Sequence, residues 1–370
     1  MKICWLVRVP VSEHAGQPYS PLAGVRMRVL MPVTELQRAG LDVRTAQLPD
    51  SGVPDAAALR MLETCDAVFF GPVLPAPGQS IDDSAPPVLK LVAHLQQCGI
   101  QTFADIHDDH FEVPGRIAYF TGLVEKVDAV FVNSAAMADL VAKYTRRPLQ
   151  VIGDPYEGPR GAVSFDPAAG RSWRDRILPW RAPRLQLAWF GHQSNLQPVY
   201  DLAQNIVDAR IAWPVDLTLV SRDGFGAREF AEIFNHHHGG RCRVKFVEWS
   251  LEETQRALDE CDLAVVPADS GLRKTAVKSP NRIVEILRAG RVPIAFPVPS
   301  YRQFAPYGWI GEDVVAGIIW AMQHRDEARI RIKAGQAYVE QNFSPESIGV
   351  QWRTALESLV PRSPVEAVES

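Results

Sequence analysis

The residues best suited to chemistry in this 370-residue sequence stand around positions 278–281, which read Lys-Ser-Pro-Asn. Ser279 is a favourable N-cap and Pro280 suits the first helical turn, so we expect a helix to begin here. The free N–H groups and the positive dipole end of a helix start attract anions. A phosphate group is therefore the ligand chemistry that this stretch suits best.

Charged and polar side chains surround the expected helix start. They are Lys274, Lys278, Ser279, Asn281, Arg282 and Glu285. The cations would offset phosphate charge, and Glu285, one turn into the helix, would accept hydrogen bonds from hydroxyl groups. The pattern alone fits equally well an ordinary crossover helix with solvated basic residues.

A second group of reactive side chains follows an expected strand at 101–106 and includes Asp105, His107, Asp108, Asp109 and His110. Its position predicts the carboxyl edge of a sheet, where α/β proteins bind ligands. A metal site is one interpretation, but hard metal ions usually draw carboxylates from several elements. A structural role, in which the aspartates cap the next helix, is the alternative to substrate contact.

Alternating strands and helices must position these side chains. Apolar runs that predict strands occur at 2–9, 41–46, 66–71, 101–106, 129–133 and 149–152, and again at 185–190, 215–220, 244–248, 263–267 and 292–296. Helical patterns separate most of them, which specifies an α/β protein with mostly parallel sheets. The glycine-rich dinucleotide fingerprint is missing.

Composition narrows the classes of function. The formal charge of −4 gives no global basic field, so we expect no nucleic-acid partner. The five cysteines lack metal-ligand spacing, which indicates free thiols in a reducing cytoplasm. The run 236–238, three histidines, fits a helix end better than a metal site. No run of about 18 apolar residues occurs, so we expect a cytoplasmic protein, with peripheral contact to the inner membrane face left open.

The stretch 263–296 resembles the C-terminal donor-binding unit of GT-B fold glycosyltransferases, in particular the large retaining glycosyltransferase family 4, also called glycosyl transferases group 1. The residues that carry the resemblance are Pro267, Glu285, Ala289, Gly290, Val292, Pro293, Ile294 and Ala295. The resemblance is strong over 185–345 and weak over 1–155. It implies two Rossmann-like doubly wound domains that face a deep cleft.

The resemblance also implies a division of the chain. Residues 1–155 would form the acceptor-side domain, 156–184 the connection and 185–345 the nucleotide-sugar donor domain. A helix at 346–360 would cross back to the first domain, and 361–370 would be a disordered tail.

The resemblance assigns roles to further residues. Gly191, His192, Asn195, Arg222 and Trp249 would join the helix-start residues in binding the nucleotide and its diphosphate, although Trp249 also suits a core position. Lys278, with Arg222 and Lys274, would stabilise the leaving diphosphate without a metal or cofactor.

In the first domain, Gly24, Arg26 and Asp108 would lie on the acceptor side, and Asp105 or His107 would contact the sugar or the acceptor. For Gly24, a simple turn is an equal alternative. An inverting mechanism would take its general base from Asp105, His107 or Asp108, whereas a retaining mechanism would need none.

The sequence departs from the family at one informative position. Retaining members carry two glutamates with seven residues between them, and Val277 occupies the position of the first. Nucleotide binding therefore carries over better than the sugar contact, and the donor sugar stays undefined. We expect a hexosyltransferase-like enzyme acting on a glycan, lipid-linked or small-molecule acceptor in bacterial surface polysaccharide biosynthesis. The alternatives are a non-catalytic GT-B module that binds nucleotide sugar or glycan, and a sugar-nucleotide epimerase, which the 278–281 stretch disfavours.

Overall fold

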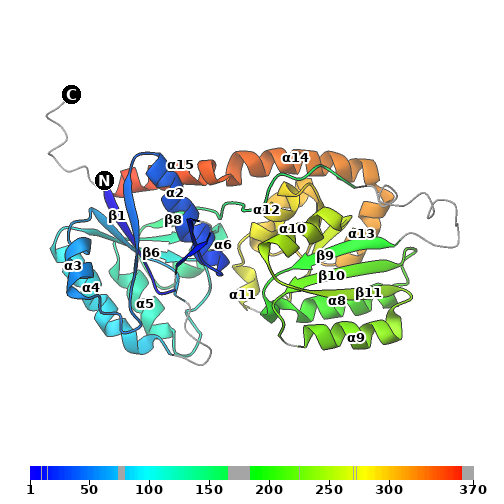
Figure 1. Cartoon of the computed structure of the whole chain (residues 1–370), viewed down its shortest axis with the longest axis horizontal. Helices are drawn as coiled ribbons and strands as arrows, with labels where there is room; N and C mark the ends of the chain where they lie inside the picture. Colours follow the sequence, from blue (N-terminus) through cyan, green and yellow to red (C-terminus); the bar gives the residue numbers. More distant parts are fainter. Residues whose placement is uncertain are drawn as a thin grey trace. The chain divides into compact units, whose positions relative to one another are not determined.

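The computed structural model describes residues 1–9, 11–14, 16–73, 80–165, 184–224, 226–269, 271 and 273–360, and these form two compact units (Figure 1). The first unit contains Met1–Pro155, Val277–Ser279 and the C-terminal part from Asn342, and the second contains Tyr156–Ala276 and Pro280–Gln341. Most of the predicted connection, and the predicted tail 361–370, lie outside the described residues.

The first unit is built on a parallel sheet whose described strands follow the order β4-β1-β5-β6-β7-β8. These strands are β1 Lys2–Val7, β4 Asp42–Gln47, β5 Ala67–Phe70, β6 Gln101–Ile106, β7 Ala129–Val132 and β8 Leu149–Val151. A small antiparallel hairpin, β2 Ser12–His14 and β3 Gln17–Tyr19, stands in the loop after β1.

Helices cover both faces of this sheet. They are α1 Ala23–Val25, a π-helical segment Arg26–Leu30, α2 Met31–Arg38, α3 Ala56–Leu62, a 3-10 turn Asp82–Ser84, α4 Ala85–Gln97, α5 Ile117–Lys126, α6 Ala135–Val141 and α15 Pro345–Leu359. Residues 23–38 thus form three joined helical segments, with the wider π turn over Arg26–Leu30.

The second unit repeats the plan with the strand order β11-β10-β9-β12-β13-β14. Its strands are β9 Leu185–Phe190, β10 Val215–Ser221, β11 Cys242–Glu248, β12 Leu263–Val266, β13 Val292–Ala295 and β14 Trp309–Ile310, all parallel to their neighbours. The two-sheet α/β fold class predicted from the sequence is confirmed.

The helical segments that follow β9 are 3-10 turn η3 Gln193–Asn195, α8 Gln197–Asp208, α9 Ala227–His238, α10 Leu251–Glu260, α11 Arg273–Ala276, α12 Asn281–Arg288, 3-10 segment η4 Pro299–Tyr307, α13 Val314–Gln323 and α14 Arg325–Phe343, whose last residues belong to the first unit. No helix in the described part of the chain has the length and apolar character needed to cross a bilayer.

The strands of the first unit are apolar on consecutive positions because both sheet faces are covered. Trp5 and Phe69 face one layer, which includes α2 and α15, whereas their neighbours Leu6 and Phe70 face the layer that includes α4 and α5. In the first layer, Trp352 of α15 stacks on Phe131 with ring centroids 4.8 Å apart. The last helix of the chain therefore completes the core of the first unit.

Truncation of Trp352 should destabilise the first unit. Trp352 is fully buried, so Trp352→Ala should lower the free energy of unfolding of the first unit by about 3–5 kcal/mol, through lost burial and an unfilled cavity. Val350 on the same helix is 54% exposed, and Val350→Ala should change stability by about 0.5 kcal/mol or less. Equilibrium denaturation measures both, and equal losses would contradict the packing role of Trp352.

Candidate functional site

The strand order of the second sheet changes direction between the paired strands β9 and β12. From β9 the chain continues outward to β10 and β11, whereas from β12 it continues to β13 and β14 on the other side. Doubly wound sheets bind ligands at the carboxyl ends of the strands beside such a switch point. Gly191 directly follows β9 and Pro267 directly follows β12, so both lie at this edge.

Arg282 in the first turn of α12 lies next to Gly191. A Cβ atom on Gly191 would stand 3.5 Å from the Arg282 Nη1 atom and 3.0 Å from the Trp189 ring, so glycine leaves room here. The Arg282 Nη2 atom donates to the Tyr301 hydroxyl at 3.5 Å, and Tyr301 is buried. The Nη1 atom is buried and has no hydrogen-bond partner among the described residues.

A buried guanidinium N–H group without a partner carries a desolvation cost that a ligand anion would remove. Guanidinium also matches phosphate oxygens in charge and in geometry. The Gly191–Arg282 pair therefore suits the binding of a phosphate group.

Two further predicted donor residues come together at the ends of the neighbouring strands β10 and β11. The Arg222 guanidinium carbon lies 5.7 Å from the centre of the Trp249 ring, and the backbone N–H of Trp249 donates to the Ser221 carbonyl at 2.9 Å. Arg222 is exposed and Trp249 is half-buried, so both present surface to solvent. A cation over an aromatic face provides a charged platform for a nucleotide.

His192 and Asn195 form the short helical turn η3 after Gly191. The His192 Nδ1 atom accepts from the backbone N–H of Ser194 at 3.2 Å, and the Asn195 N–H donates to the His192 carbonyl at 2.9 Å. These bonds fix the loop that follows β9.

Glu285 is held inside the second unit by the chain itself. Its two carboxylate oxygens accept from the backbone N–H groups of Glu157 at 2.6 Å and Gly158 at 3.0 Å. Burial, together with the charge of Glu157, raises its pKa to about 7, although the two amide bonds oppose this increase. The expected hydroxyl acceptor is thus also an anchor for the segment that begins at Tyr156.

Residues 277–279 belong to the first unit, whereas Arg282 and Glu285 belong to the second. Val277 lies in the apolar core of the first unit, and the Ser279 hydroxyl donates to Asp154. Lys278 between them is half-buried. Asn281 is the first residue of α12, and Lys274 lies in α11 with its side chain outside the described part of the structure.

Asp105 at the end of β6 forms a buried ion pair with Arg28. The Arg28 Nη2 atom lies 2.6 Å from Oδ1 of Asp105, and the Nε atom lies 3.2 Å from both carboxylate oxygens. The Asp105 side chain is fully buried. Its carboxylate is thus engaged by Arg28, which the sequence did not single out.

His107 and Asp108 follow β6 and remain accessible. The His107 Nε2 atom lies 3.5 Å from Oδ2 of Asp108, and the His107 side chain is 20% exposed. A Cβ on Gly24 would stand only 2.7 Å from this Nε2 atom, so Gly24 lies directly against the imidazole. The structure therefore brings three of the predicted residues of the first unit together.

Arg26 turns back onto its own loop instead. It is buried, its Nη1 atom donates to the Ser20 carbonyl at 2.9 Å, and its guanidinium lies 5.9 Å from the Tyr19 ring. These contacts tie Arg26 to the hairpin after β1.

His110, near the same edge, has a lowered pKa. Burial and the nearby charge of Arg116 lower its pKa to about 4, although Asp108 opposes the shift. The Arg116 Nη1 atom lies 3.1 Å from the His110 Nδ1 atom, which therefore accepts the hydrogen bond. His110 is consequently neutral at physiological pH.

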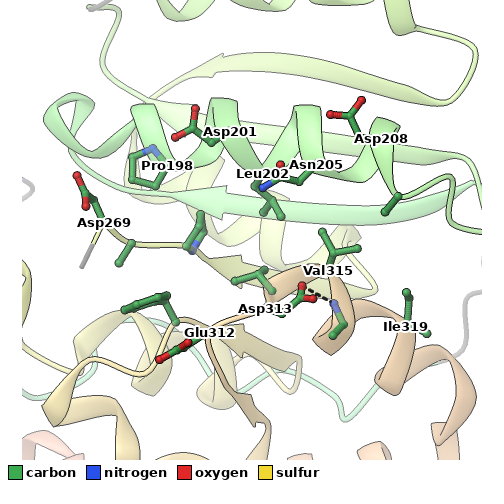
Figure 2. Close-up of a pocket in the computed structure, with 16 residues that line it drawn as sticks. Pro198, Asp201, Leu202, Asn205, Asp208, Asp269, Glu312, Asp313, Val315 and Ile319 are labelled. Carbon is green, nitrogen blue, oxygen red and sulfur yellow. Dashed lines mark hydrogen bonds between the residues drawn. The ribbon is translucent and has the colours of Figure 1, made fainter. Parts of the chain in front are cut away.

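A pocket of about 690 Å³ lies in the second unit between α8 and α13, and Pro267 at the end of β12 is one of its lining residues (Figure 2). Five carboxylates line it, from Asp201, Asp208, Asp269, Glu312 and Asp313. None of the predicted site residues is among its lining residues, and its negative charge disfavours a diphosphate. The Gly191–Arg282 pair therefore suits a phosphate group better than this pocket does.

The raised pKa of Glu285 predicts a pH-dependent stability. The folded state holds a proton that the unfolded state releases above its ordinary pKa of 4.5, so the stabilisation is complete below that value and is lost as pH rises to about 7. The stability of the wild-type protein relative to Glu285→Gln should fall by up to about 3 kcal/mol over this range.

Denaturation of both proteins at pH 4.5, 6, 7 and 8 measures this difference. The comparison with the variant is needed because the lowered pKa of His110 acts in the opposite direction between about pH 4 and 6.5. A difference that stays constant with pH would contradict the assignment.

Comparison with known proteins gives similarity in structure alone. No family model matches the chain, and no curated protein matches its sequence. A glycosyltransferase from Rickettsia africae ESF-5 superposes with a TM-score of 0.62 at 10% identity, with 98% of this chain and 99% of that one covered. The apo form of the lipopolysaccharide outer core galactosyltransferase WaaB gives a TM-score of 0.61 at 10% identity, with coverage of 97% and 99%.

The structure of TarM gives a TM-score of 0.53 at 12% identity over 79% of this chain. The match covers 54% of TarM, so the chain spans about half the length of that protein. At these identities the likeness concerns the fold. Together with the two parallel sheets, it shows that the chain has the GT-B fold of glycosyltransferases, as the sequence resemblance predicted.

Proposed function

We propose that this protein transfers a sugar from a nucleotide-sugar donor to a glycan, lipid-linked or small-molecule acceptor. The observation that carries the proposal is the buried, unpartnered Nη1 atom of Arg282 beside Gly191. It lies at the switch-point edge of the second sheet in a GT-B fold, where a nucleotide diphosphate would find a cation and space for its phosphate oxygens.

The donor would be held by residues of several loops. Arg282 and Arg222 would bind the diphosphate, Trp249 would flank the base, and Gly191 would let the phosphate approach the backbone. His192, Asn195, Ser279 and Asn281 would add polar contacts, and Lys278 and Lys274 would offset charge on the leaving diphosphate. This arrangement requires no metal ion in principle.

Glu285 would have two tasks. A carboxylate offers about four acceptor positions, and the amides of Glu157 and Gly158 use two of them. We propose that the remaining positions receive ribose hydroxyl groups, so that donor binding and the anchoring of the 157–158 segment share one side chain.

His107 is the best candidate for a general base if transfer proceeds with inversion. The Asp105 carboxylate is engaged by Arg28, whereas the His107 imidazole is partly exposed and lies beside Asp108. The acceptor hydroxyl would lose its proton to His107 Nε2 as its oxygen attacks the anomeric carbon, and the carboxylate of Asp108 would stabilise the imidazolium. A retaining mechanism would use His107 to position the acceptor instead.

A bacterial surface glycan is the acceptor class that we favour. The proposal is supported by the similar structure of WaaB, a lipopolysaccharide outer core galactosyltransferase. A lipid-linked acceptor would bring the protein into peripheral contact with a membrane surface.

A non-catalytic nucleotide-sugar or glycan-binding module is the second candidate. It is favoured by one observation, the buried Val277 at the position where the family carries its sugar-side glutamate. Slow release of free nucleotide from a donor sugar would separate an enzyme from this alternative.

The donor site can be tested by nucleotide binding. Arg282→Ala should weaken the affinity for the preferred nucleoside diphosphate by about 10- to 100-fold, because a charge-assisted hydrogen bond is lost, while nucleoside affinity changes little. Arg302 is exposed and one residue from Tyr301, so Arg302→Ala provides a charge-matched control. Isothermal titration measures these affinities, after a thermal-shift screen of nucleoside diphosphates and nucleotide sugars has identified the base. Equal losses for diphosphate and nucleoside would remove the phosphate role of Arg282.

The acceptor-side group can be tested by steric displacement. Gly24→Ala places a Cβ 2.7 Å from the His107 Nε2 atom, so the imidazole must move. We expect kcat for transfer to fall about tenfold or more, by analogy with the loss of a positioned general base, with donor affinity unchanged. His107→Gln should show a similar loss. Gly240→Ala is a matched control, because a Cβ there meets no atom within 4 Å. Unchanged kcat in both test variants would exclude His107 from the reaction.

A further inference from the structure

A cluster of three potential metal ligands lies in the first unit, away from the residues discussed above. It consists of Glu63, His94 and Cys98, whose ligand atoms all lie within 4.8 Å of one another. The His94 Nε2 atom is 2.7 Å from Oε1 of Glu63 and 3.9 Å from the Cys98 Sγ atom. All three side chains reach the surface, and Cys98 is a free, exposed thiol.

Helix geometry and sheet topology bring the three residues together. His94 and Cys98 are four positions apart on α4, so their side chains lie on one face, one turn apart. Glu63 caps the C-terminal end of α3. Helices α3 and α4 lead into β5 and β6, which are neighbours in the sheet, so both helices end at the amino edge of that sheet.

The electrostatic setting favours a cation. Two helix C-termini direct their negative dipole ends toward this edge, and Glu63 adds a full negative charge. With a thiolate at Cys98 and a neutral His94, the three ligands would balance the charge of a divalent ion.

The ligand set matches zinc. Carboxylate oxygen, imidazole nitrogen and thiolate sulfur are the three ligand types that Zn²⁺ takes in proteins, at about 2.0–2.3 Å. Tetrahedral coordination at these lengths would require about 3.3 Å between Glu63 Oε1 and His94 Nε2 and about 3.6 Å between His94 Nε2 and Cys98 Sγ. The first pair would have to separate by about 0.6 Å and the second to approach by about 0.3 Å, which side-chain rotation at exposed helix ends allows.

We propose that Glu63, His94 and Cys98 bind one Zn²⁺ ion, with water in the fourth position. On binding, the Cys98 thiol loses its proton to solvent, and bonds to zinc replace the hydrogen bond between Glu63 and His94. The ion would join the ends of α3 and α4. Because His107 follows the carboxyl end of β6, and this cluster lies at the amino edge of the same sheet, the role of the ion would be structural and not catalytic.

Metal binding to the full-length protein tests the proposal. The purified chain, stripped of metal and kept reduced with a phosphine, should bind one equivalent of Zn²⁺ in competition with a chromophoric chelator. Substitution with Co²⁺ should produce a sulfur-to-cobalt charge-transfer band, which only a thiolate ligand gives. Each of Cys98→Ser, His94→Gln and Glu63→Gln should weaken Zn²⁺ binding by about tenfold or more, since even residues that only support a metal ligand contribute 10- to 100-fold.

Two controls separate this site from other ligands in the chain. Cys65→Ser removes a thiol two residues from Glu63 that does not belong to the cluster. Replacement of His236, His237 and His238 by glutamine removes the histidine run at the end of α9. Both controls should retain the zinc affinity and the cobalt band. Absence of the band, unchanged affinity in Cys98→Ser, or loss of binding in the histidine-run variant would each overturn the proposal.

Discussion

The first unit depends most on the buried ion pairs and hydrogen bonds of the Arg28 guanidinium. The guanidinium meets both oxygens of Asp105, the carbonyl groups of Ile152 and Gly153, and the carboxylate of Asp154. Burial alone would lower the pKa of Arg28, but the two carboxylates reverse this and raise it. A paired charge of this kind adds modest net stability, yet removal of one partner typically costs about 3–5 kcal/mol, because the other charge stays buried.

The contacts of Arg28 extend to the edges of the unit. Its guanidinium lies 5.1 Å from the Trp352 ring of α15, and Asp154 accepts a hydrogen bond from Ser279. One side chain thus connects the strand that precedes His107, the loop after β8, the last helix and the segment that contains Lys278. The buried Arg28 guanidinium therefore helps to position the accessible groups at this edge.

Local patterns predicted much of the fold. The strand positions and the alternation of strands and helices are short-range features, and they appear in the structure. The N-cap predicted at Ser279 was wrong, because α12 begins at Asn281 after Pro280 and the Ser279 hydroxyl donates to Asp154 instead. The sequence also predicts roles for Gly191 and Arg282, because a glycine directly after a strand and an arginine in a first helical turn are local patterns, and the structure places the two residues side by side.

The parts that the sequence did not predict depend on distant partners. Arg28 stands among apolar residues in a helix, and its partner Asp105 is 77 positions away. The residues near Arg28 in the chain therefore do not predict the ion pair. The amides that hold Glu285 lie 127 and 128 positions earlier. The sequence gives no strand signal for the hairpin β2–β3, because its strands have three residues each and no apolar alternation.

The participation of α15 in the first unit has a consequence for synthesis. The strands of the first unit are complete once β8 has been made, but the side chain that fills their aromatic layer belongs to residue 352. During synthesis, the part of this sheet face that α15 covers stays exposed until nearly the whole chain has been made, although α2 is already present on the same face. The second unit, complete at Gln341, becomes available earlier, so the usual order in which N-terminal domains mature first is reversed. During that interval the exposed face of the first sheet is the part of the nascent protein most in need of a chaperone.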